Sequence, residues 1–301
     1  MLKWLSHRTP GAWRDWIQES PGLKPPQHVA DGTVRVTFVG HSTTLIQLDG
    51  RNFLTDPIWS MRASPLSFMG PKRHRAPGIR FEELPRIDAI LISHNHYDHL
   101  DTPTLRKLCD KDQPEIFCPL KVGELLRKCG FATVHELDWW QTVETQDGAR
   151  LVCTPAQHFS ARGIFDRDKT LWCGWMIASA HGNVYFAGDT GYAPENFDGL
   201  VERYGQPRVA LLPIGAYRPE WFMGPVHMSP DDAFRAHQKL GATASVTIHH
   251  GTFRLADDGE TEGEERLKDL LRESGVSNFH VVREGAAKAI LSSNSSNTAA
   301  K

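Results

Sequence analysis

The sequence predicts an α/β fold, a four-layer sandwich in which two β-sheets pack face to face between outer helices. Both halves of the chain contain several strand-like runs followed by helix–strand units. The composition, with 40% apolar and 23% charged residues, is typical of a globular protein. A chain of 301 residues is long enough to bury a large core. No linker-like composition interrupts residues 34–291, so we expect a single domain over residues 31–291.

Short β-rich runs dominate the first half of the chain. Residues 34–39, 44–48 and 52–54 are rich in β-branched and aliphatic side chains, and Asp49-Gly50 between the last two is a hairpin-turn signal. Residues 89–92 (AILI) form a continuous apolar run, which is typical of a strand buried on both faces. We therefore expect four strands in this region.

Helix signals alternate with further strand-like runs along the rest of the chain. One helix is expected from about Pro103, and another from Pro230 with Ser229 as its N-cap. The remaining expected elements are helices over residues 122–128 and 260–274 and strands over residues 151–154, 172–178, 184–187, 209–212, 244–248 and 287–291.

The two ends of the chain are expected to be peripheral. The Pro-rich residues 21–28 separate an N-terminal extension, residues 1–30, from the first strand. The polar residues 292–301 lack apolar periodicity, which predicts a disordered tail.

Composition also limits the compartment and the partners. The five cysteines are odd in number and contain no C-x-x-C pair, which indicates reduced thiols. No apolar run approaches the roughly 18 residues of a membrane span, and the N-terminus lacks the apolar run of a signal peptide. The formal net charge of −2 argues against nucleic-acid binding. We expect a cytoplasmic protein with no nucleic-acid partner.

The main chemical feature is the motif Ser93-His94-Asn95-His96-Tyr97-Asp98-His99, directly after residues 89–92. Alternate residues of an extended chain point the same way, so His94, His96 and Asp98 can converge on one point while His99 turns in from the other side. Histidine is the commonest metal ligand. These four side chains are more than one tetrahedral ion requires if it also has ligands from other parts of the chain. They therefore suggest two neighbouring ions.

Further candidate ligands stand where predicted strands end. They are His158, Asp189 and one of the adjacent His249 and His250. A third imidazole would complete the first ion, a carboxylate could bridge both ions, and a last histidine would complete the second ion. His41 carries no strong ligand argument, and we expect it to pack or to support a ligand.

With these residues in view, the sequence resembles the metallo-β-lactamase superfamily, whose pattern is His-x-His-x-Asp-His, then His, Gly-Asp-Thr-Gly and His. Within this superfamily it is similar to the N-acylphosphatidylethanolamine-hydrolysing phospholipase D family over roughly residues 34–255. The similarity rests on residues 54–57, 62–65, 70–73, 93–101, 186–192, 213–217, 221–223 and 248–253.

The resemblance implies an αββα catalytic domain that holds two zinc ions. By this resemblance the first ion has His94, His96 and His158, the second has Asp98, His99 and His249, and Asp189 bridges them. His250 stands where we expect a tryptophan in animal members, which leaves two candidates at this position. We prefer His249 because it directly follows the strand and keeps the spacing to residues 251–253.

The resemblance also implies a metal-dependent phosphodiesterase of the phospholipase D type. Such an enzyme hydrolyses N-acylphosphatidylethanolamine-like phospholipids to N-acylethanolamine and phosphatidic acid by a metal-bridging hydroxide. Asp98 and Asp189 would be catalytic, with Asp98 positioning the water or accepting its proton. His227 lies just before the helix expected from Pro230, where an anion is favoured, and by resemblance it would contact the phosphate. The alternative is a metal-dependent lactonase, or a phosphodiesterase with a soluble substrate.

Two segments raise the question of membrane contact. Trp4, Trp13 and Trp16 suit either a membrane interface or packing onto the core or a partner subunit. Residues 72–75 (KRHR) are either attracted to anionic head groups or are solvated loop charge. We expect a phospholipid or another phosphodiester as the substrate partner. Peripheral contact with the inner face of the membrane and a homodimer are left open.

Overall fold

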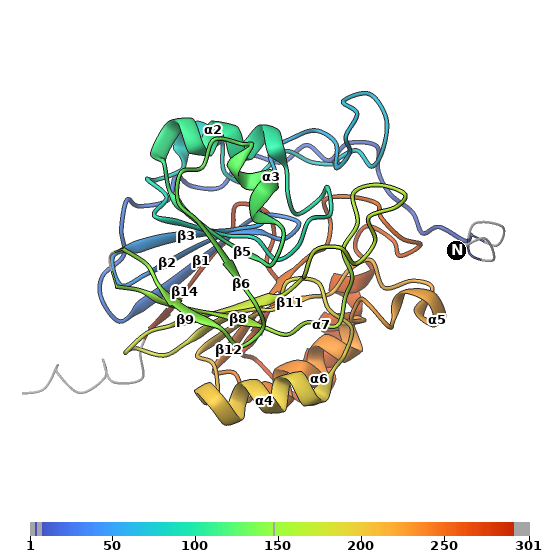
Figure 1. The fold of residues 1–301 in the computed structure, drawn as a ribbon. Coiled ribbons are helices and arrows are strands. Elements are labelled where there is room, and N and C mark those ends of the chain that lie inside the picture. Colours follow the sequence, from blue (N-terminus) through green and yellow to red (C-terminus); the bar gives the residue numbers. More distant parts are fainter. Residues whose placement is uncertain (1–3, 5–7, 147, 292–301) are drawn as a thin grey trace, which may run out of the picture.

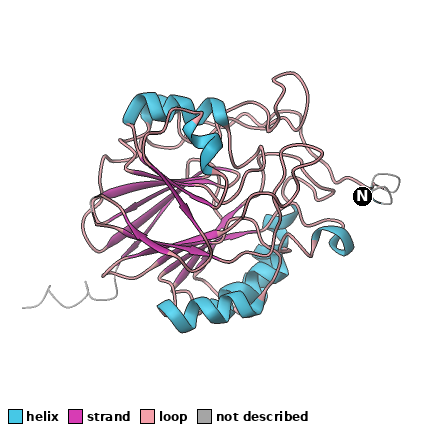
Figure 2. Ribbon diagram, viewed as in Figure 1, coloured by secondary structure: helices cyan, strands magenta, loops and turns pink. Residues whose placement is uncertain are grey.

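Two seven-stranded sheets dominate the computed structural model, which describes residues 4, 8–146 and 148–291 (Figures 1 and 2). In spatial order, the first sheet comprises β14 (Ala287–Leu291), β1 (Thr33–Gly40), β2 (Thr43–Leu48), β3 (Arg51–Thr55), β4 (Ala89–Leu91), β5 (Glu115–Pro119) and β6 (Val134–Leu137). The second comprises β13 (Phe279–His280), β12 (Ala244–Ile248), β11 (Val209–Pro213), β10 (Val184–Phe186), β9 (Gly174–Ala178), β8 (Arg150–Thr154) and β7 (Thr142–Glu144). The predicted tail, residues 292–301, lies outside the described residues.

Helices cover the outer face of each sheet, so the predicted four-layer α/β sandwich is confirmed (Figure 2). The first sheet carries α2 (Thr102–Asp112) and α3 (Gly123–Arg127), and the second carries α4 (Pro194–Tyr204), α6 (Pro230–Leu240) and α7 (Glu262–Ser274). Two short helices, η1 (Phe81–Glu83) and α5 (Glu220–Met223), lie in connecting segments. The predicted N-cap of α6 is confirmed, because Ser229 and Asp232 form a reciprocal capping box.

The core consists of three apolar layers that follow from the strand patterns. In β1, Val34, Val36 and Phe38 face the layer between the sheets, because alternate residues of a strand share a face. In β4, Leu91 faces this central layer while Ile90 faces the layer under α2 and α3. The continuous apolar run of β4 is therefore buried on both faces, as predicted.

The strand directions bring several loops to one edge of the sandwich. Strands β3 to β6 run parallel, and so do β10 to β13. Strand β8 is antiparallel to β9, which is antiparallel to β10, so β8 and β10 share a direction. Polar residues that follow these strands can therefore meet at one edge, where sites in α/β folds usually form.

The N-terminal extension is tied to this same edge. The Gly11 amide donates to the Asp257 carbonyl, and the Gly22 amide donates to the Gly78 carbonyl. The Trp4 indole donates to the Asp257 carboxylate at 2.8 Å, and the Trp13 indole donates to the Asp258 carbonyl at 2.9 Å. For Trp4 and Trp13, packing onto the protein is therefore what the structure shows.

The basic run at residues 72–75 is largely internal. Arg73 is 2% exposed and donates to the carbonyls of Ser60 and Ile58. Arg75 is 4% exposed and pairs with Glu284 at 2.8 Å. Neither guanidinium is free to meet lipid head groups, so both alternatives considered from the sequence, head-group attraction and solvated loop charge, are wrong for these two arginines.

The cysteines and the length of the helices can also be compared with the expectations from the sequence. All five cysteines are buried free thiols, as expected. Over the described part of the chain, we find no helix with the length and apolar character needed to cross a bilayer.

Candidate metal centre

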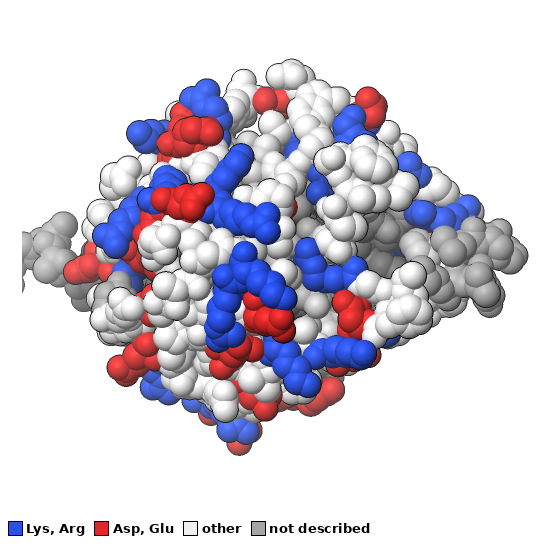
Figure 3. Space-filling view, turned by 45° about the horizontal axis from the view of Figure 1, so that its top comes forward, with Lys and Arg blue, Asp and Glu red and all other residues white. Residues whose placement is uncertain are grey.

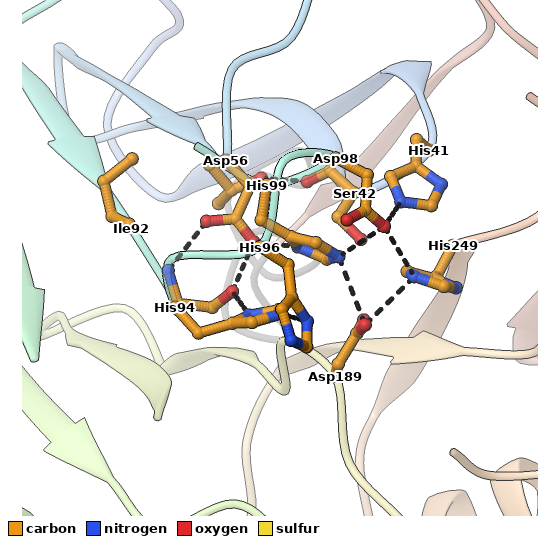
Figure 4. A network of polar contacts seen from close by, with 12 residues as sticks. His41, Ser42, Asp56, Ile92, His94, His96, Asp98, His99, Asp189 and His249 are labelled. Carbon is orange, nitrogen blue, oxygen red and sulfur yellow. Dashed lines mark hydrogen bonds and ion pairs between the residues drawn. The ribbon is translucent and has the colours of Figure 1, made fainter. Parts of the chain in front are cut away.

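Loops that follow strands bring the predicted metal-binding side chains together at one edge of the sandwich (Figure 4). Residues 93–99 follow β4, His158 follows β8, Asp189 follows β10 and His249 follows β12. Three of these four strands belong to the second sheet and one to the first, so the centre lies between the two halves of the molecule.

Two glycines allow the backbone to approach this centre closely. Gly188 has φ of +61°, and a Cβ atom there would lie 2.8 Å from the Cys173 carbonyl oxygen. At Gly215, a Cβ atom would lie 2.1 Å from the carbonyl oxygen of His249. Glycine at these positions therefore lets the chain present Asp189 and His249 without a steric clash.

The adjacent histidines His249 and His250 have different surroundings. His249 has φ of +57°, a left-handed conformation that is uncommon for residues with a side chain, and its ring lies in the cluster. The ring of His250 stacks on Phe38 in the core, with Nε2 3.0 Å from the Thr247 hydroxyl and Nδ1 3.3 Å from Glu264. The geometry thus brings His249, and not His250, to the other candidate ligands.

The first pocket is formed by three histidines: His94, His96 and His158. His94 Nε2 lies 2.7 Å from His96 Nδ1, and His158 Nε2 lies 3.3 Å from the same atom. Burial lowers the pKa of His94 well below its usual value, that of His96 to about 4 and that of His158 to about 3. The three imidazoles are therefore neutral at physiological pH, which is the state that binds metals.

The second pocket contains Asp98, His99 and His249, with His41 beside them, and Asp189 Oδ2 lies within 3.8 Å of ligand nitrogens of both pockets. Burial alone would lower the pKa of His99, yet Asp189 and Asp98 raise it well above the usual value. The pKa of His249 is raised to about 9, because Asp189 and Asp98 outweigh burial. In the absence of a cation, this pocket therefore holds protons that balance its carboxylates.

The spacing of ligand atoms in the second pocket fits a tetrahedral ion. Asp189 Oδ2 lies 3.1 Å from His99 Nε2 and 3.0 Å from His249 Nε2. Asp98 Oδ2 lies 3.3 Å from His99 Nε2 and 3.7 Å from His249 Nε2. A tetrahedral zinc site with bonds of about 2.0–2.2 Å has edges of about 3.3–3.6 Å. The four distances, 3.0–3.7 Å, are close to these edges, so the atoms are near enough to one another to share one ion.

Asp189 also touches the first pocket. The same Oδ2 atom lies 3.8 Å from His158 Nε2, while Oδ1 is buried without a hydrogen-bond partner. His99 Nε2 and both ring nitrogens of His249 likewise lack a hydrogen bond. Buried polar atoms are rarely left unpaired, so this set of atoms fits a bound cation.

Two residues outside the motif hold the second pocket in place. Asp56 Oδ2 lies 2.7 Å from His99 Nδ1 and accepts a hydrogen bond from the Ser93 hydroxyl. His41 Nε2 lies 2.8 Å from Asp98 Oδ2. The supporting contact expected of His41 is therefore present, whereas no local sequence pattern pointed to the role of Asp56. Partners of this kind fix ligand orientation in metal sites.

His227 lies beside both pockets. Its side chain is buried, its ring is 5.0 Å from that of His158 and 5.3 Å from that of His249, and Nδ1 lies 3.8 Å from Asp189 Oδ2. Nδ1 has no hydrogen-bond partner. Burial lowers the pKa of this imidazole to about 3. His227 thus lies next to the candidate ligands, and its contact with a phosphate stays a prediction.

Comparison with known proteins identifies the class. The family described as Beta-lactamase superfamily domain matches residues 51–250. A solved structure of Igni18, a metallo hydrolase from the archaeon Ignicoccus hospitalis, superposes with a TM-score of 0.64 at 24% identity, covering 86% of this chain and 98% of Igni18. The chain belongs to the metallo-β-lactamase superfamily, and its predicted membership is confirmed.

Two curated relatives narrow the comparison within this superfamily. An N-acyl-phosphatidylethanolamine-hydrolyzing phospholipase D 1 of Caenorhabditis elegans is 38% identical over 78% of this chain and 69% of the relative. A mitochondrial N-acyl-phosphatidylethanolamine-hydrolyzing phospholipase D of Saccharomyces cerevisiae is 34% identical over 86% of this chain but only 55% of the relative. Together with the histidine and aspartate cluster, these relatives identify a metal-dependent hydrolase.

Proposed function

We propose that the protein is a binuclear zinc phosphodiesterase that hydrolyses N-acylphosphatidylethanolamine-like phospholipids in the manner of a phospholipase D. The observation that carries this proposal is the spacing of ligand atoms around Asp189 Oδ2, which lies within 3.8 Å of ligand nitrogens from both pockets. A structural zinc site needs no carboxylate shared between two ligand sets. The imidazole-rich donors favour zinc.

The chain's own residues have separate roles in this proposal. His94, His96 and His158 would hold one ion, Asp98, His99 and His249 the other, and Asp189 both. When bound, the ions would supply Lewis acidity at phosphate oxygens and lower the pKa of the attacking water. The other steps involve protein side chains, water and the substrate.

Asp98 and His227 are suited to act on the substrate. The Asp98 side chain is 13% exposed, against 2% for Asp189, so Asp98 is the carboxylate better placed to accept a proton from an entering water. His227 has a free Nδ1 beside Asp189, and this imidazole would bind a phosphate oxygen by donating an N–H hydrogen bond. The water oxygen would bond to phosphorus while the bond from phosphorus to the ethanolamine oxygen breaks, and the departing alkoxide would take up the proton that Asp98 had accepted.

The substrate class rests on the two relatives whose names specify N-acyl-phosphatidylethanolamine. Because the chain spans 69% and 55% of their lengths, their substrate is a hypothesis for this protein. Cytoplasmic localisation, with contact at the inner face of the membrane, is part of the same hypothesis.

The direct test is product analysis with zinc-loaded protein and N-acylphosphatidylethanolamine in ¹⁸O-labelled water. We expect N-acylethanolamine without the label and phosphatidic acid with one ¹⁸O atom, because water attacks phosphorus. A parallel screen would include lactones and water-soluble diesters. Turnover of lactones alone, or of soluble diesters without any phospholipid, would replace the proposal with the corresponding alternative.

A further inference from the structure

Exposed apolar side chains gather in two loops of this molecule. Among the described residues, ten large apolar side chains are exposed, and six of them lie in residues 61–70 (the first loop) or 160–169 (the second loop). Phe68 is 75% exposed in the first loop, and Ile164 and Phe165 are 90% and 85% exposed in the second. Such a concentration of exposed apolar surface usually marks an interaction site.

Internal hydrogen bonds give the second loop a defined shape. The Asp166 carboxylate accepts hydrogen bonds from the backbone amides of Gly163, at 2.8 Å, and Arg162, at 3.1 Å. The Asp168 amide donates to the Ser160 carbonyl at 2.8 Å, which closes the base of the loop. Ile164 and Phe165 are therefore presented at the tip of a built turn.

The first loop is closed at its base in a similar way. Arg62 and Lys72 form an antiparallel bridge, and the Ala63 amide donates to the Pro71 carbonyl at 3.0 Å. Leu66, Phe68 and Met69 follow beyond this base. In Figure 1 this loop stands out at the upper right, and the second loop lies on the same side of the molecule.

Both loops lie next to the segment that carries the metal-binding motif. Ser64 and Pro65 of the first loop and Arg162 of the second line one cavity of about 290 Å³, together with Tyr97 from the metal-binding motif. The second loop directly follows His158, and the intervening Phe159 packs against the ring of His96 at 4.5 Å. A surface that binds these loops would therefore lie close to the centre.

Basic side chains accompany the apolar tips. Arg62 and Lys72 stand at the base of the first loop, where Lys72 pairs with Asp15, and Arg167 and Lys169 lie in the second, where Arg167 pairs with Asp168. The two acidic residues of the second loop, Asp166 and Asp168, accept backbone hydrogen bonds within it. Figure 3 shows Lys and Arg side chains gathered around a hollow near the middle of the face that it presents. Cations beside exposed apolar side chains complement a layer of phosphate head groups over hydrocarbon.

We propose that these two loops dock the protein on a phospholipid bilayer, with their apolar tips entering the boundary between head groups and acyl chains. This inference rests on the proposed function, since a phospholipid substrate is presented at such a surface. It assigns membrane contact to loops 61–70 and 160–169, and not to Trp4, Trp13 or the arginines of residues 72–75.

The test compares vesicle binding of full-length, zinc-loaded variants. The double variant Ile164→Ser with Phe165→Ser removes the second tip, and Phe68→Ser with Met69→Ser removes the first. Leu23→Ser is the matched control, because Leu23 is 85% exposed but lies outside both loops. Vesicles of phosphatidylcholine with a minority of phosphatidylglycerol serve as the probe in a sedimentation assay. Circular dichroism and zinc content verify that each variant is folded.

We expect the affinity of each double variant for vesicles to fall by about tenfold or more, because exposed apolar side chains no longer enter the interface. Hydrolysis of N-acylphosphatidylethanolamine in vesicles should fall in parallel, while hydrolysis of bis(p-nitrophenyl) phosphate, a soluble diester, stays unchanged. The Leu23→Ser variant should behave as wild type in all assays.

The outcomes separate this inference from the proposed function. Unchanged vesicle binding in both double variants overturns the docking surface, even if the enzyme cleaves phospholipids. A change in oligomeric state without a change in vesicle binding overturns it as well, because the loops then form a protein interface. Loss of vesicle binding in a protein that hydrolyses no diester supports docking and rejects the proposed function.

Discussion

The two pockets of the candidate metal centre share Asp189 but differ in the charge of their other side chains. The first pocket contains only histidines, and burial lowers the pKa of His96 to about 4 and of His158 to about 3. In the second pocket, carboxylates raise the pKa of His249 to about 9. Protons are thus absent from the first pocket at neutral pH and present in the second. An ion that enters the second pocket would therefore compete with protons for its ligands, whereas an ion that enters the first pocket would not.

The supporting contacts of the pockets differ as well. In the first pocket, His158 Nδ1 lies 2.9 Å from the Val226 carbonyl oxygen, and His94 Nδ1 lies 2.9 Å from the Ser93 hydroxyl. In the second pocket, Asp56 lies beside His99 and His41 beside Asp98. Asp56 also accepts a hydrogen bond from Ser93, so His41 is the supporting residue whose substitution should weaken the second pocket selectively.

The largest effect is expected for the residue common to both pockets. Asp189→Asn removes the shared charge with little change in shape, so we expect loss of tightly bound zinc and a fall of about 10³-fold or more in diester hydrolysis. Asp198→Asn is the matched control, because Asp198 is a surface carboxylate with a side chain 60% exposed. Metal analysis after dialysis and initial rates measure both effects. Full zinc content together with the full rate in Asp189→Asn would refute the bridging role.

The next largest effect is expected when one histidine ligand of a single pocket is removed. His158→Ala and His249→Ala each remove a ligand from one pocket, so each variant should retain about one ion per chain and lose about 10²-fold or more in rate. His28→Ala, a substitution of an exposed histidine, should keep both ions. Either ligand variant that kept two tightly bound ions would exclude its histidine from the ligand set.

Acidification should weaken the second pocket first. The pKa of His249 is raised to about 9, so below that pH an entering ion must displace a proton, and apparent affinity falls by about tenfold per pH unit for each displaced proton. The histidines of the first pocket have lowered pKa values and hold no proton to displace near neutrality. Zinc titrations by calorimetry at pH 8 and pH 6, in buffers of different ionisation enthalpy, measure the released protons. Equal pH dependence of the two binding steps would contradict the difference in protonation between the two pockets.

A smaller effect is expected from the support of Asp98. His41→Ala removes the contact between His41 Nε2 and Asp98 Oδ2, so zinc affinity of the second pocket should fall by about 10–100-fold, with the first pocket unchanged. Competition with a chromogenic chelator resolves the two affinities. An equal loss in both pockets would indicate a general loss of structure and not a local one.

The smallest effect on the metal centre is expected for His250→Gln. His250 contacts Glu264, Thr247 and Phe38 and no other candidate ligand, so both ions and the hydrolysis rate should be retained. The loss of buried contacts should lower the free energy of unfolding by about 1–3 kcal/mol, measured by urea denaturation. If zinc were lost without loss of stability, His250 would be the ligand in place of His249.

Much of the fold and of the centre follows from local sequence patterns. The β-rich run of β1, the apolar run of β4 and the N-cap at Ser229 are all short-range signals that the structure reproduces. The candidate ligands stand out because each follows a strand-like run and because His94, His96, Asp98 and His99 crowd one segment. Their division between two ions and the role of His227 come from the family resemblance. Such signals need no knowledge of which segments meet in space.

Other features depend on partners that lie far away in the chain. Asp56 and His41 support residues 43 and 57 positions away, so their roles emerge only after folding. The partners of Arg75 are Glu260 and Glu284, at separations of 185 and 209 residues, which is why residues 72–75 resembled a solvated charge run. The expected elements do not include β5, β6, β7, β13 or α4. A proline at the start of α4 and apolar residues at helical spacing, Phe197, Leu200 and Val201, could have indicated that helix.

In the proposed centre, Asp189 joins two differently charged pockets that hold two zinc ions. Diffraction from crystals of the zinc-loaded protein, recorded on both sides of the zinc absorption edge, would locate these ions. We expect two anomalous peaks about 3.5–4 Å apart. One peak would lie among His94, His96 and His158, the other among Asp98, His99 and His249, with Asp189 between them. A single peak, or a second peak away from Asp189, would contradict this arrangement.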